Sequence, residues 1–324
     1  MSRRRARPRP LSPRDGIDPV SVRLPDDRSC RVGEHLLLRF PASRAQLERL
    51  LSDGEIVDDR GAPLPADAPC AGQRVWYHRE LPVEPELPHD LPVLYEDEWL
   101  LAVDKPHGLP STPRGGFIAQ TALSVLRRRR GEDDLVPAHR LDRDTAGVLL
   151  LIRDPRARGA VQRQFQDRRT EKSYEAVARL GGLVLEDLPD RRSSRLLKQR
   201  GVLQAAEVPG EPNAVTHLDP LSAFEDDDGR WAHLRLHPLT GQTHQLRVHL
   251  AALGTPIRWD PLYPQVLPRE PGDVSRPLQL LARTLRLTHP VTGQALELRS
   301  RRRLETLPPL MPPRRSRGGV RADR

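Results

Sequence analysis

The sequence has little cysteine, few aromatic residues and no long hydrophobic run. Its two cysteines, Cys30 and Cys70, are too few for a metal cluster or a disulfide framework. The longest uninterrupted apolar stretch is far shorter than the roughly 20 residues that cross a bilayer, and the basic N-terminus has no apolar signal core. We therefore expect a cytoplasmic protein without membrane contact.

Lysine is also scarce, so the basic character of the chain comes from arginine. The net charge is +9. Residues 1–14 hold six arginines and no acid, and residues 299–324 hold nine arginines against two acids, which leaves the rest mildly acidic. Arginine-rich ends suit phosphate contacts with a nucleic acid. A general bias toward arginine would give the same composition, so composition alone leaves both interpretations open.

Proline content and hydrophobic patterning divide the chain into five regions. Residues 1–20 are expected to be a disordered basic tail and residues 301–324 a second basic tail. Residues 21–80 form a candidate small module, with helices over 36–40 and 45–51, a strand and turn over 54–61 and a closing strand over 72–77. Residues 81–91 are proline-rich and predict an extended linker. Residues 92–300 are the main domain.

The main domain mixes strands and helices without regular alternation, which is typical of an α+β fold. The predicted strands cover 93–95, 99–103, 148–152, 173–180, 231–236 and a closing hairpin of 281–287 with 295–298. Helices are predicted over 121–130 and from Asp154-Pro155, where Asp is an N-cap and Pro the first helical residue. Residues 181–230 are expected to be an irregular surface insertion.

The most informative segment is the nonapeptide His-Arg-Leu-Asp-Arg-Asp-Thr-Ala-Gly at 139–147. It leads directly into the apolar run 148–152, which is typical of a strand buried on both faces. Asp142 therefore lies at the edge of a core, where burial and partners shift a carboxyl pKa. The alternative is an arginine-rich loop whose aspartates only neutralise neighbouring arginines.

The nonapeptide resembles the nucleophile loop of the RluA-type pseudouridine synthases, with Ala146 where serine is usual. Three further segments resemble the same family, in the same order along the chain. They are the Lys-Pro-x-Gly-Leu loop at 103–110, the Lys-x-Tyr element at 171–174 and the Gly-x-Thr-His-Gln-x-Arg helix at 238–249. The resemblance covers roughly residues 91–300.

This resemblance implies a mixed, mainly antiparallel sheet and an enzyme that isomerises uridine in RNA without a cofactor or metal. Asp142 would be the nucleophile, whether it attacks the ribose or the base or promotes glycal formation. Arg247 would supply the charge that keeps Asp142 ionised. Its position at the border of the stripe Leu246, Leu250 and Leu253 on a helix agrees with that role. Tyr174 would stack on the flipped uracil.

The resemblance also implies a set of RNA-binding residues. Arg140 would fill the space that the extruded base leaves, His139 and Thr145 would orient the loop, and Lys105 would contact the RNA backbone; Lys172 and His244 complete the set. The module at 21–80 is similar to an S4-type RNA-binding domain, although Glu48, Asp53 and Glu55 dilute its basic helix face. We expect a monomer that acts on ribosomal RNA first and transfer RNA second.

Two departures from the family pattern put the substrate contacts in doubt. Gln242 stands where arginine or lysine is usual, and residues 256–264 replace a more glycine-rich loop. Neither departure touches Asp142, Tyr174 or Arg247.

Two other functions compete with the enzyme. The first is a non-catalytic RNA-binding protein in ribosome or transfer RNA maturation. The second is a metal-dependent hydrolase that uses Asp142, Asp144, His244 and His249. On a helix, histidines five residues apart point about 140° away from each other, whereas metal-binding helices use a spacing of four.

Overall fold

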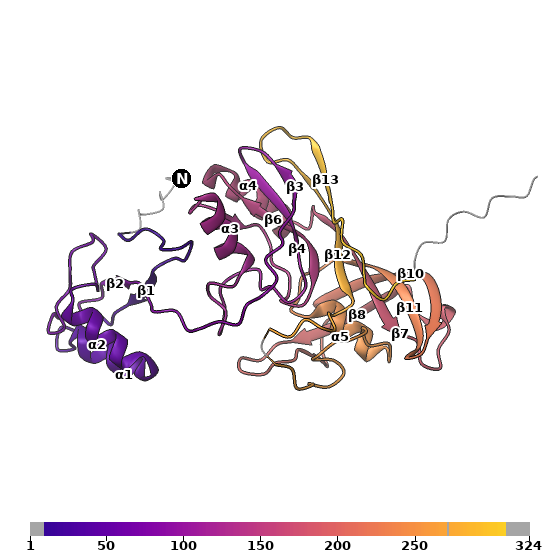
Figure 1. Cartoon of the computed structure of the whole chain (residues 1–324), viewed down its shortest axis with the longest axis horizontal. Coiled ribbons are helices and arrows are strands. Elements are labelled where there is room, and N and C mark those ends of the chain that lie inside the picture. Colours follow the sequence, from indigo (N-terminus) through magenta and orange to yellow (C-terminus); the bar gives the residue numbers. More distant parts are fainter. Residues whose placement is uncertain (1–9, 271, 309–324) are drawn as a thin grey trace, which may run out of the picture. The chain divides into compact units, whose positions relative to one another are not determined.

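The computed structural model describes residues 10–270 and 272–308, which form two compact units (Figure 1). The first unit holds the described residues up to Arg143 together with Leu149–Gly159. The second holds Asp144–Val148 and the described residues from Ala160 onward. Residues 1–9 and 309–324 of the two predicted basic tails lie outside the described residues. The disorder predicted for residues 10–20 is wrong, because Ile17 is buried and bridges to Arg14, and the first strand begins at Val20.

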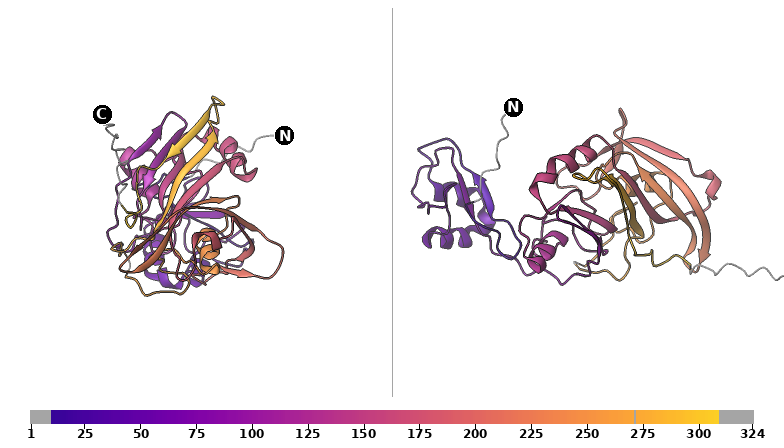
Figure 2. Two further views of the ribbon diagram at one scale, coloured as in Figure 1. Left: turned by 90° about the vertical axis from the view of Figure 1, so that its right-hand side faces the viewer. Right: turned by 90° about the horizontal axis from the view of Figure 1, so that it is seen from above.

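The first unit begins with a small module that has its own core. Helices α1 (Val32–Arg39) and α2 (Arg44–Ser52) lie side by side, and strand β1 (Val20–Arg23) pairs antiparallel with β2 (Arg74–Tyr77) (Figures 1 and 2). Both predicted helices are confirmed. Of the strand and turn predicted over 54–61, the turn is confirmed and the strand is not formed, since only Val57 forms bridges there. The Asp58 carboxylate accepts the N–H groups of Arg60 and Ala62 instead and turns the chain.

The remainder of the first unit surrounds a second apolar core. It contains β3 (Val93–Glu96), β4 (Leu100–Lys105), α3 (Ala122–Arg130), β5 (Val136–Pro137) and the later residues of β6 (Ala146–Ile152). Thr121 caps α3 by accepting the N–H of Ser124, and Gly131 ends it in a left-handed conformation. The strands β3, β4 and β6 and the helix α3 agree with the elements predicted from the sequence, whereas β5 was not predicted.

Residues 81–91 have no regular secondary structure, but they are anchored to this core. Leu87 and Leu91 are buried in it. The Glu84 carboxylate accepts hydrogen bonds from three successive backbone N–H groups, at residues 118–120. The segment is therefore attached to the protein at Glu84, Leu87 and Leu91.

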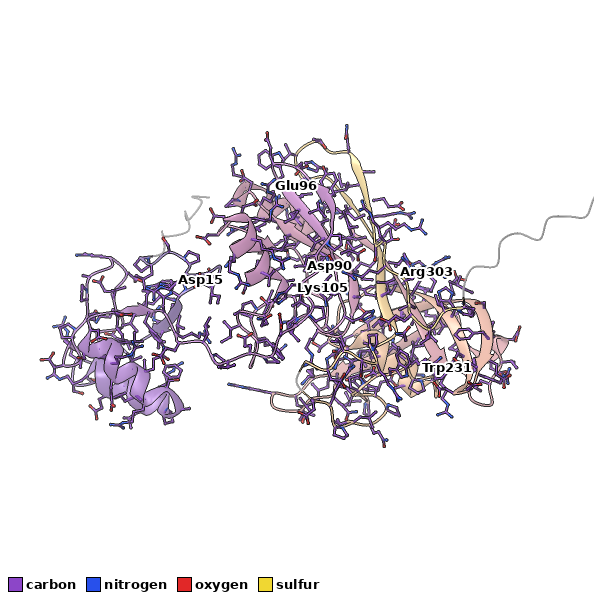
Figure 3. The ribbon with its side chains drawn as sticks, in the orientation of Figure 1. Asp15, Asp90, Glu96, Lys105, Trp231 and Arg303 are labelled. Carbon is purple, nitrogen blue, oxygen red and sulfur yellow. The ribbon has the colours of Figure 1, made fainter. Side chains whose placement is uncertain are left out.

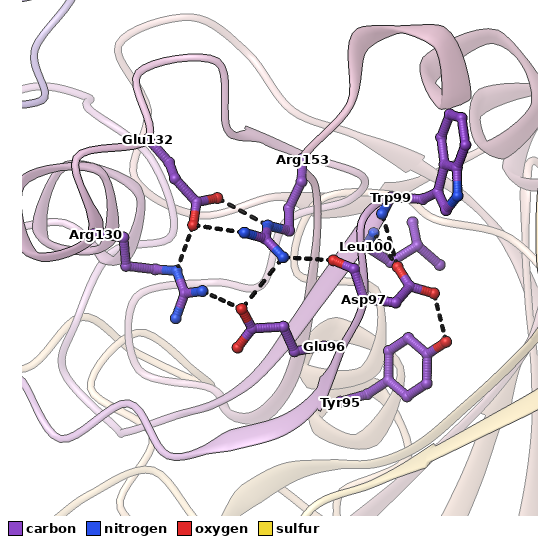
Figure 4. Close-up of polar contacts among 8 residues, drawn as sticks. All are labelled: Tyr95, Glu96, Asp97, Trp99, Leu100, Arg130, Glu132 and Arg153. Carbon is purple, nitrogen blue, oxygen red and sulfur yellow. Dashed lines mark hydrogen bonds and ion pairs between the residues drawn. The ribbon is translucent and has the colours of Figure 1, made fainter.

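A network of ion pairs closes the edge of this core (Figure 4). Arg130 and Arg153 share the carboxylate of Glu132, and both arginines also contact Glu96. The neighbouring Asp97 carboxylate accepts the N–H groups of residues 99 and 100 and the hydroxyl of Tyr95. The network connects the end of α3 and the end of β6 to the turn between β3 and β4.

The second unit is built on a long, mainly antiparallel sheet. Its strand order is β6–β12–β7–β11–β10–β8–β9, and β13 pairs with β12. The strands are β7 (Glu171–Arg179), β8 (Arg191–Leu197), β9 (Ala206–Val208), β10 (Ala214–Asp226), β11 (Gly229–Pro238), β12 (Leu280–Thr288) and β13 (Ala295–Arg299). Among the strand pairs that the described residues of this unit form, only β6 with β12 is parallel. The predicted α+β class with a mixed, mainly antiparallel sheet is confirmed.

The prediction of an irregular insertion over 181–230 is wrong. That stretch contains a short 3₁₀ turn (Leu185–Asp187) and strands β8, β9 and β10, and β10 pairs with β11 along almost its whole length. Pro220 lies at a bulge in β10, and the exposed part of the strand is rich in acids, which hid the strand pattern.

Two helices complete the second unit. The helix predicted from Asp154-Pro155 begins as a 3₁₀ turn (Pro155–Ala157) and continues as α4 (Arg158–Gln166). Helix α5 (Gln245–Ala252) packs on one face of the sheet through Leu246 and Leu250, and Gly254 follows it with a positive φ. No helix among the described residues is long and apolar enough to span a membrane.

Candidate active site

The loop that carries Asp142 is held on both sides of that residue. Ser111 donates its hydroxyl to the carbonyl of Leu141 (2.8 Å) and accepts the Leu141 N–H (3.0 Å). On the other side, Lys105 Nζ donates to the carbonyl of Arg143 (3.0 Å). The Asp142 side chain itself is only partly buried. The backbone at Asp142 is therefore fixed while its carboxylate remains within reach of solvent.

Lys105 lies at the end of β4 and is fully buried (Figure 3). Besides Arg143, its ammonium donates to the carbonyls of Pro106 (2.9 Å) and Leu109 (2.7 Å). Three backbone carbonyls thus surround the Lys105 ammonium, which was expected to contact the RNA backbone. This burial contradicts the expected RNA contact of Lys105. The buried ammonium instead joins two loops of the protein.

The other predicted residues of the loop differ in exposure. Arg140 is exposed, as a residue that meets RNA must be. His139 is half-buried, and its Nε2 accepts the N–H of Leu150 on β6 (3.1 Å), so His139 ties the loop to the strand that follows it. Thr145 is buried, with 3% of its surface exposed. Thr145 therefore has little exposed surface with which to contact RNA directly.

In the second unit, Tyr174 and Lys172 lie on the same face of β7. Tyr174 packs against the core that α5 covers. Lys172 is two residues earlier, and its Nζ lies 3.5 Å from the carbonyl of Thr240. Burial lowers the pKa of Lys172, helped by the charge of Arg168. Tyr174 and the partly buried Lys172 thus project from the same face of one strand.

Helix α5 is fixed to the sheet by Gln245. The Gln245 side-chain oxygen accepts the hydroxyl of Thr240 (2.7 Å), and its amide donates to the carbonyl of Val215 (2.9 Å) and to Thr216 (3.0 Å). His244 precedes the helix with a φ of 57°. The His244 ring nitrogen Nδ1 lies 2.9 Å from the hydroxyl of Tyr263. These contacts fix the start of α5 to the sheet, and Arg247 lies in the first turn of that helix.

Arg247 is almost completely buried and forms a bidentate ion pair with Asp260. Arg247 Nε donates to Asp260 Oδ2 (2.8 Å) and Nη2 donates to Oδ1 (2.6 Å). The Arg247 side chain is 2% exposed and that of Asp260 is 0% exposed. A buried charge needs such a partner, because an unpaired one is strongly unfavourable.

Sequence reasoning did not identify Ser111, Asp260 or Tyr263. For Asp260 a signal was present, since it is the only Asp or Glu between residues 229 and 269. A buried arginine on the preceding helix has no nearer carboxylate along the chain. For Ser111 no comparable signal exists, because its partner Leu141 is 30 residues away and the contact is with backbone atoms.

On the opposite face of β7, charged side chains line a cavity of about 300 Å³ between β7, β11, β12 and β13. Glu175 lies in its wall and pairs with Arg283 through two hydrogen bonds (2.9 and 2.7 Å). Burial alone would raise the pKa of Glu175, but the contacts with His233 and Arg283 outweigh it and lower the pKa to about 2. Tyr174 faces away from this cavity, since successive strand residues alternate.

His249, a ligand in the metal-hydrolase alternative, has both ring nitrogens in contact with hydroxyl groups. Nδ1 lies 2.9 Å from Thr216 Oγ1 and Nε2 lies 3.1 Å from Ser194 Oγ. Burial lowers the His249 pKa to about 4, so the ring is neutral at pH 7. The described residues contain no group of three or more His, Cys, Asp or Glu side chains arranged to hold a metal ion.

The sequence and the fold are also similar to those of known proteins. The profile of a family described as RNA pseudouridylate synthase matches residues 99–252. A Synechocystis protein named uncharacterized RNA pseudouridine synthase is 35% identical over 228 residues, 68% of this chain and 75% of the relative. The ribosomal large subunit pseudouridine synthase D of Pseudomonas aeruginosa is 32% identical over 282 residues, 81% of this chain and 85% of the relative. The solved structure titled Human RNA Pseudouridylate Synthase Domain Containing 1 is 27% identical, with a TM-score of 0.52 over 67% of this chain and 86% of that chain.

Proposed function

Because this chain belongs to the RNA pseudouridylate synthase family and is an RNA pseudouridine synthase, we propose that it modifies uridines of large-subunit ribosomal RNA with Asp142 as the nucleophile. The choice of RNA is supported by the relatives named ribosomal large subunit pseudouridine synthase D, which are 30–32% identical over 79–84% of this chain. Transfer RNA is the second candidate substrate.

One observation carries the choice of Asp142. Its two chain neighbours are pinned through their backbone atoms by Ser111 and Lys105, while its own side chain is only half-buried. A carboxylate that must attack a substrate has to be held in place without being covered. The arginine-rich-loop alternative provides no reason for two buried side chains to fix this backbone.

The other catalytic roles rest on the family resemblance and on local geometry. Arg247 would stabilise the ionised carboxylate, since its guanidinium is held rigidly and cannot lose its charge. Tyr174 would stack on the flipped base, and the half-buried Lys172 would lie near the RNA. The exposed Arg140 would occupy the place that the base leaves, while His139, Thr145 and His244 would orient the loops around it.

The experiment that tests the proposal is pseudouridine mapping across all cellular RNA in cells that lack the gene. The deletion strain is complemented with the wild type or with Asp142→Asn. Loss of a ribosomal RNA site that only the wild type restores is the expected result. Loss confined to transfer RNA would contradict the substrate, and restoration by Asp142→Asn would contradict the nucleophile.

We further propose that the N-terminal module is S4-like and binds RNA. Support comes from its two adjacent helices followed by a closing strand, and from exposed Arg39 and Arg44 on those helices. Replacement of both arginines by glutamate should weaken RNA binding without changing the chemical rate on bound RNA. An unchanged RNA affinity would contradict this role.

Finally, we propose that the chain acts as a monomer in the cytoplasm, where ribosomal RNA is found. Cys30 and Cys70 are free thiols whose sulfur atoms lie 2.8 Å apart, a state that suits a reducing compartment. Light scattering on the purified protein tests the oligomeric state, and cell fractionation tests the location.

A further inference from the structure

The segment that departs from the family pattern, residues 256–264, carries the partner of Arg247. Asp260 lies in the middle of this segment and is 13 residues after Arg247 in the chain. Its Oδ1 atom also accepts the N–H groups of Leu262 (2.8 Å) and Tyr263 (3.1 Å). The carboxylate is therefore fixed by its own backbone before it meets the guanidinium.

The Arg247 guanidinium makes a second contact, with an aromatic ring of the same segment. Its Cζ atom lies 5.3 Å from the ring centroid of Tyr263. The Tyr263 hydroxyl accepts the N–H of Ala205 (2.6 Å), lies 3.2 Å from the Ala205 carbonyl and meets His244 Nδ1. All of these contacts are satisfied together if Tyr263 donates to Ala205 and His244 donates to Tyr263. The ring under Arg247 is thus held from two directions.

The beginning of the same segment is attached to the sheet independently. Arg258 is stacked between Trp231 (4.2 Å) and Trp259 (5.1 Å), measured from its Cζ to each ring centroid; Trp231 is labelled in Figure 3. Its guanidinium pairs with Asp226 and Asp228 at the end of the β10–β11 hairpin, both at 2.5 Å. Residues 258–263 are therefore anchored on both sides of Asp260.

We propose that Asp260 is a positioning residue of the pseudouridine synthase reaction, which holds the Arg247 guanidinium in its working orientation. Asp260 takes the Nε hydrogen and one Nη2 hydrogen, so rotation about the Cδ–Nε bond is blocked. Arginine carries five N–H donors, and this pair uses two of them along one edge of the guanidinium. Such rigid pre-orientation is what makes a charged group effective toward a reacting centre. The inference rests on the proposed role of Arg247.

The test compares single-turnover rates and RNA dissociation constants, using the RNA fragment that the mapping experiment identifies. Asp260→Asn keeps the shape of the side chain but turns one N–H donor toward the guanidinium. We expect the rate to fall roughly 10- to 100-fold with the RNA dissociation constant unchanged within about 3-fold. A purely structural role would reduce the folded fraction and leave the rate of the folded enzyme unchanged.

A double-mutant cycle separates this proposal from the proposed function. If Asp260 acts through Arg247, Arg247→Met with Asp260→Asn should be no slower than Arg247→Met alone. If the rate of the double variant falls by the product of the two single losses, the positioning role is overturned. A wild-type rate for Asp260→Asn would overturn it as well. A wild-type rate for Arg247→Met would instead overturn the role of Arg247 itself. Near-UV circular dichroism and thermal midpoints report whether each variant folds.

Two more variants keep the test informative. Asp228→Asn removes an exposed carboxylate from the anchor of the same segment, so its rate should stay within about 2-fold of wild type. If Asp260→Asn does not fold, Asp260→Glu replaces it, because it retains the charge and displaces the carboxylate by one methylene. A slowed Asp260→Glu with wild-type RNA affinity supports the positioning role, and an unchanged rate overturns it.

Discussion

The ammonium group of Lys105 donates a 3.0 Å hydrogen bond to the carbonyl oxygen of Arg143, the residue directly after Asp142. The two residues are 38 positions apart in the chain, and Lys105 has no exposed surface. A buried cation therefore connects the loop after β4 to the loop of the proposed nucleophile. Lys105 therefore connects these two loops in the folded protein whether or not RNA is bound.

Replacement of Lys105 by methionine should reduce stability and activity together. Methionine has a similar length but leaves three buried carbonyls without their donor, which should cost about 2–4 kcal/mol of unfolding free energy. Urea denaturation measures this loss. RNA affinity of the folded variant should match wild type, and a selective loss of RNA affinity would restore the original expectation for Lys105. Lys198→Met, which removes a less buried lysine that also donates to carbonyls, is the matched control.

Replacement of Asp142 by asparagine should abolish catalysis and leave the fold intact. The amide has the same shape but is not a nucleophile, so the single-turnover rate should fall by at least about 10³-fold, as for other covalent catalysts that lose the attacking group. Thermal midpoint and RNA affinity should stay near wild type, because the loop is held by Ser111 and Lys105 rather than by Asp142 alone. Asp133→Asn, at an exposed position, serves as the control.

Glu175 should make the protein sensitive to acid. Its pKa is lowered from 4.5 to about 2 in the folded state, so its stabilising contribution is complete above pH 4.5 and is lost as the pH falls toward 2. The full contribution is on the order of 3 kcal/mol. Urea midpoints measured between pH 6 and pH 3 should therefore converge for wild type and Glu175→Gln. A constant difference across that range would show that Glu175 is not the titrating group.

Cys70 should resist alkylation in the folded protein. Burial and the hydrogen bond to Cys30 raise the pKa of the Cys70 thiol to about 12. The thiolate fraction at pH 8 is then on the order of 10⁻⁴, and only the thiolate reacts. Mass spectrometry after iodoacetamide treatment should find Cys70 unmodified in buffer and modified in urea. Equal labelling under both conditions would contradict the buried thiol pair.

Elements with a strong local pattern were predictable from the sequence. The apolar strand β6, the helix α5 with its following glycine and the hairpin of β12 with β13 all lie where their periodicity predicts. Strand β10 was missed because it is half-exposed and carries Pro220 at a bulge. Its identity is set by its partner β11, which a local window does not contain.

The candidate site was predictable where residue identity carries the chemistry and not where backbone contacts do. Asp142, Tyr174 and Arg247 follow from their motifs. The burial of Lys105 does not, because a lysine next to a proline and a glycine predicts a surface loop unless its carbonyl partners are known. The pairing of Arg247 with Asp260 also requires knowing that both side chains leave solvent, which depends on the packing of α5 on the sheet.

The attachment of residues 81–91 has a consequence for how far the N-terminal module can travel. Glu84, which follows β2 in the chain, accepts hydrogen bonds from three backbone N–H groups. Asp18, which precedes β1, pairs with the buried Arg127. Both ends of the module are therefore attached to the protein, so the module is not joined to it by a long flexible linker. A shorter tether confines a bound ligand to a smaller volume and raises its effective concentration. RNA bound by the module, the role proposed for it above, would thus meet the remainder of the first unit as an intramolecular partner.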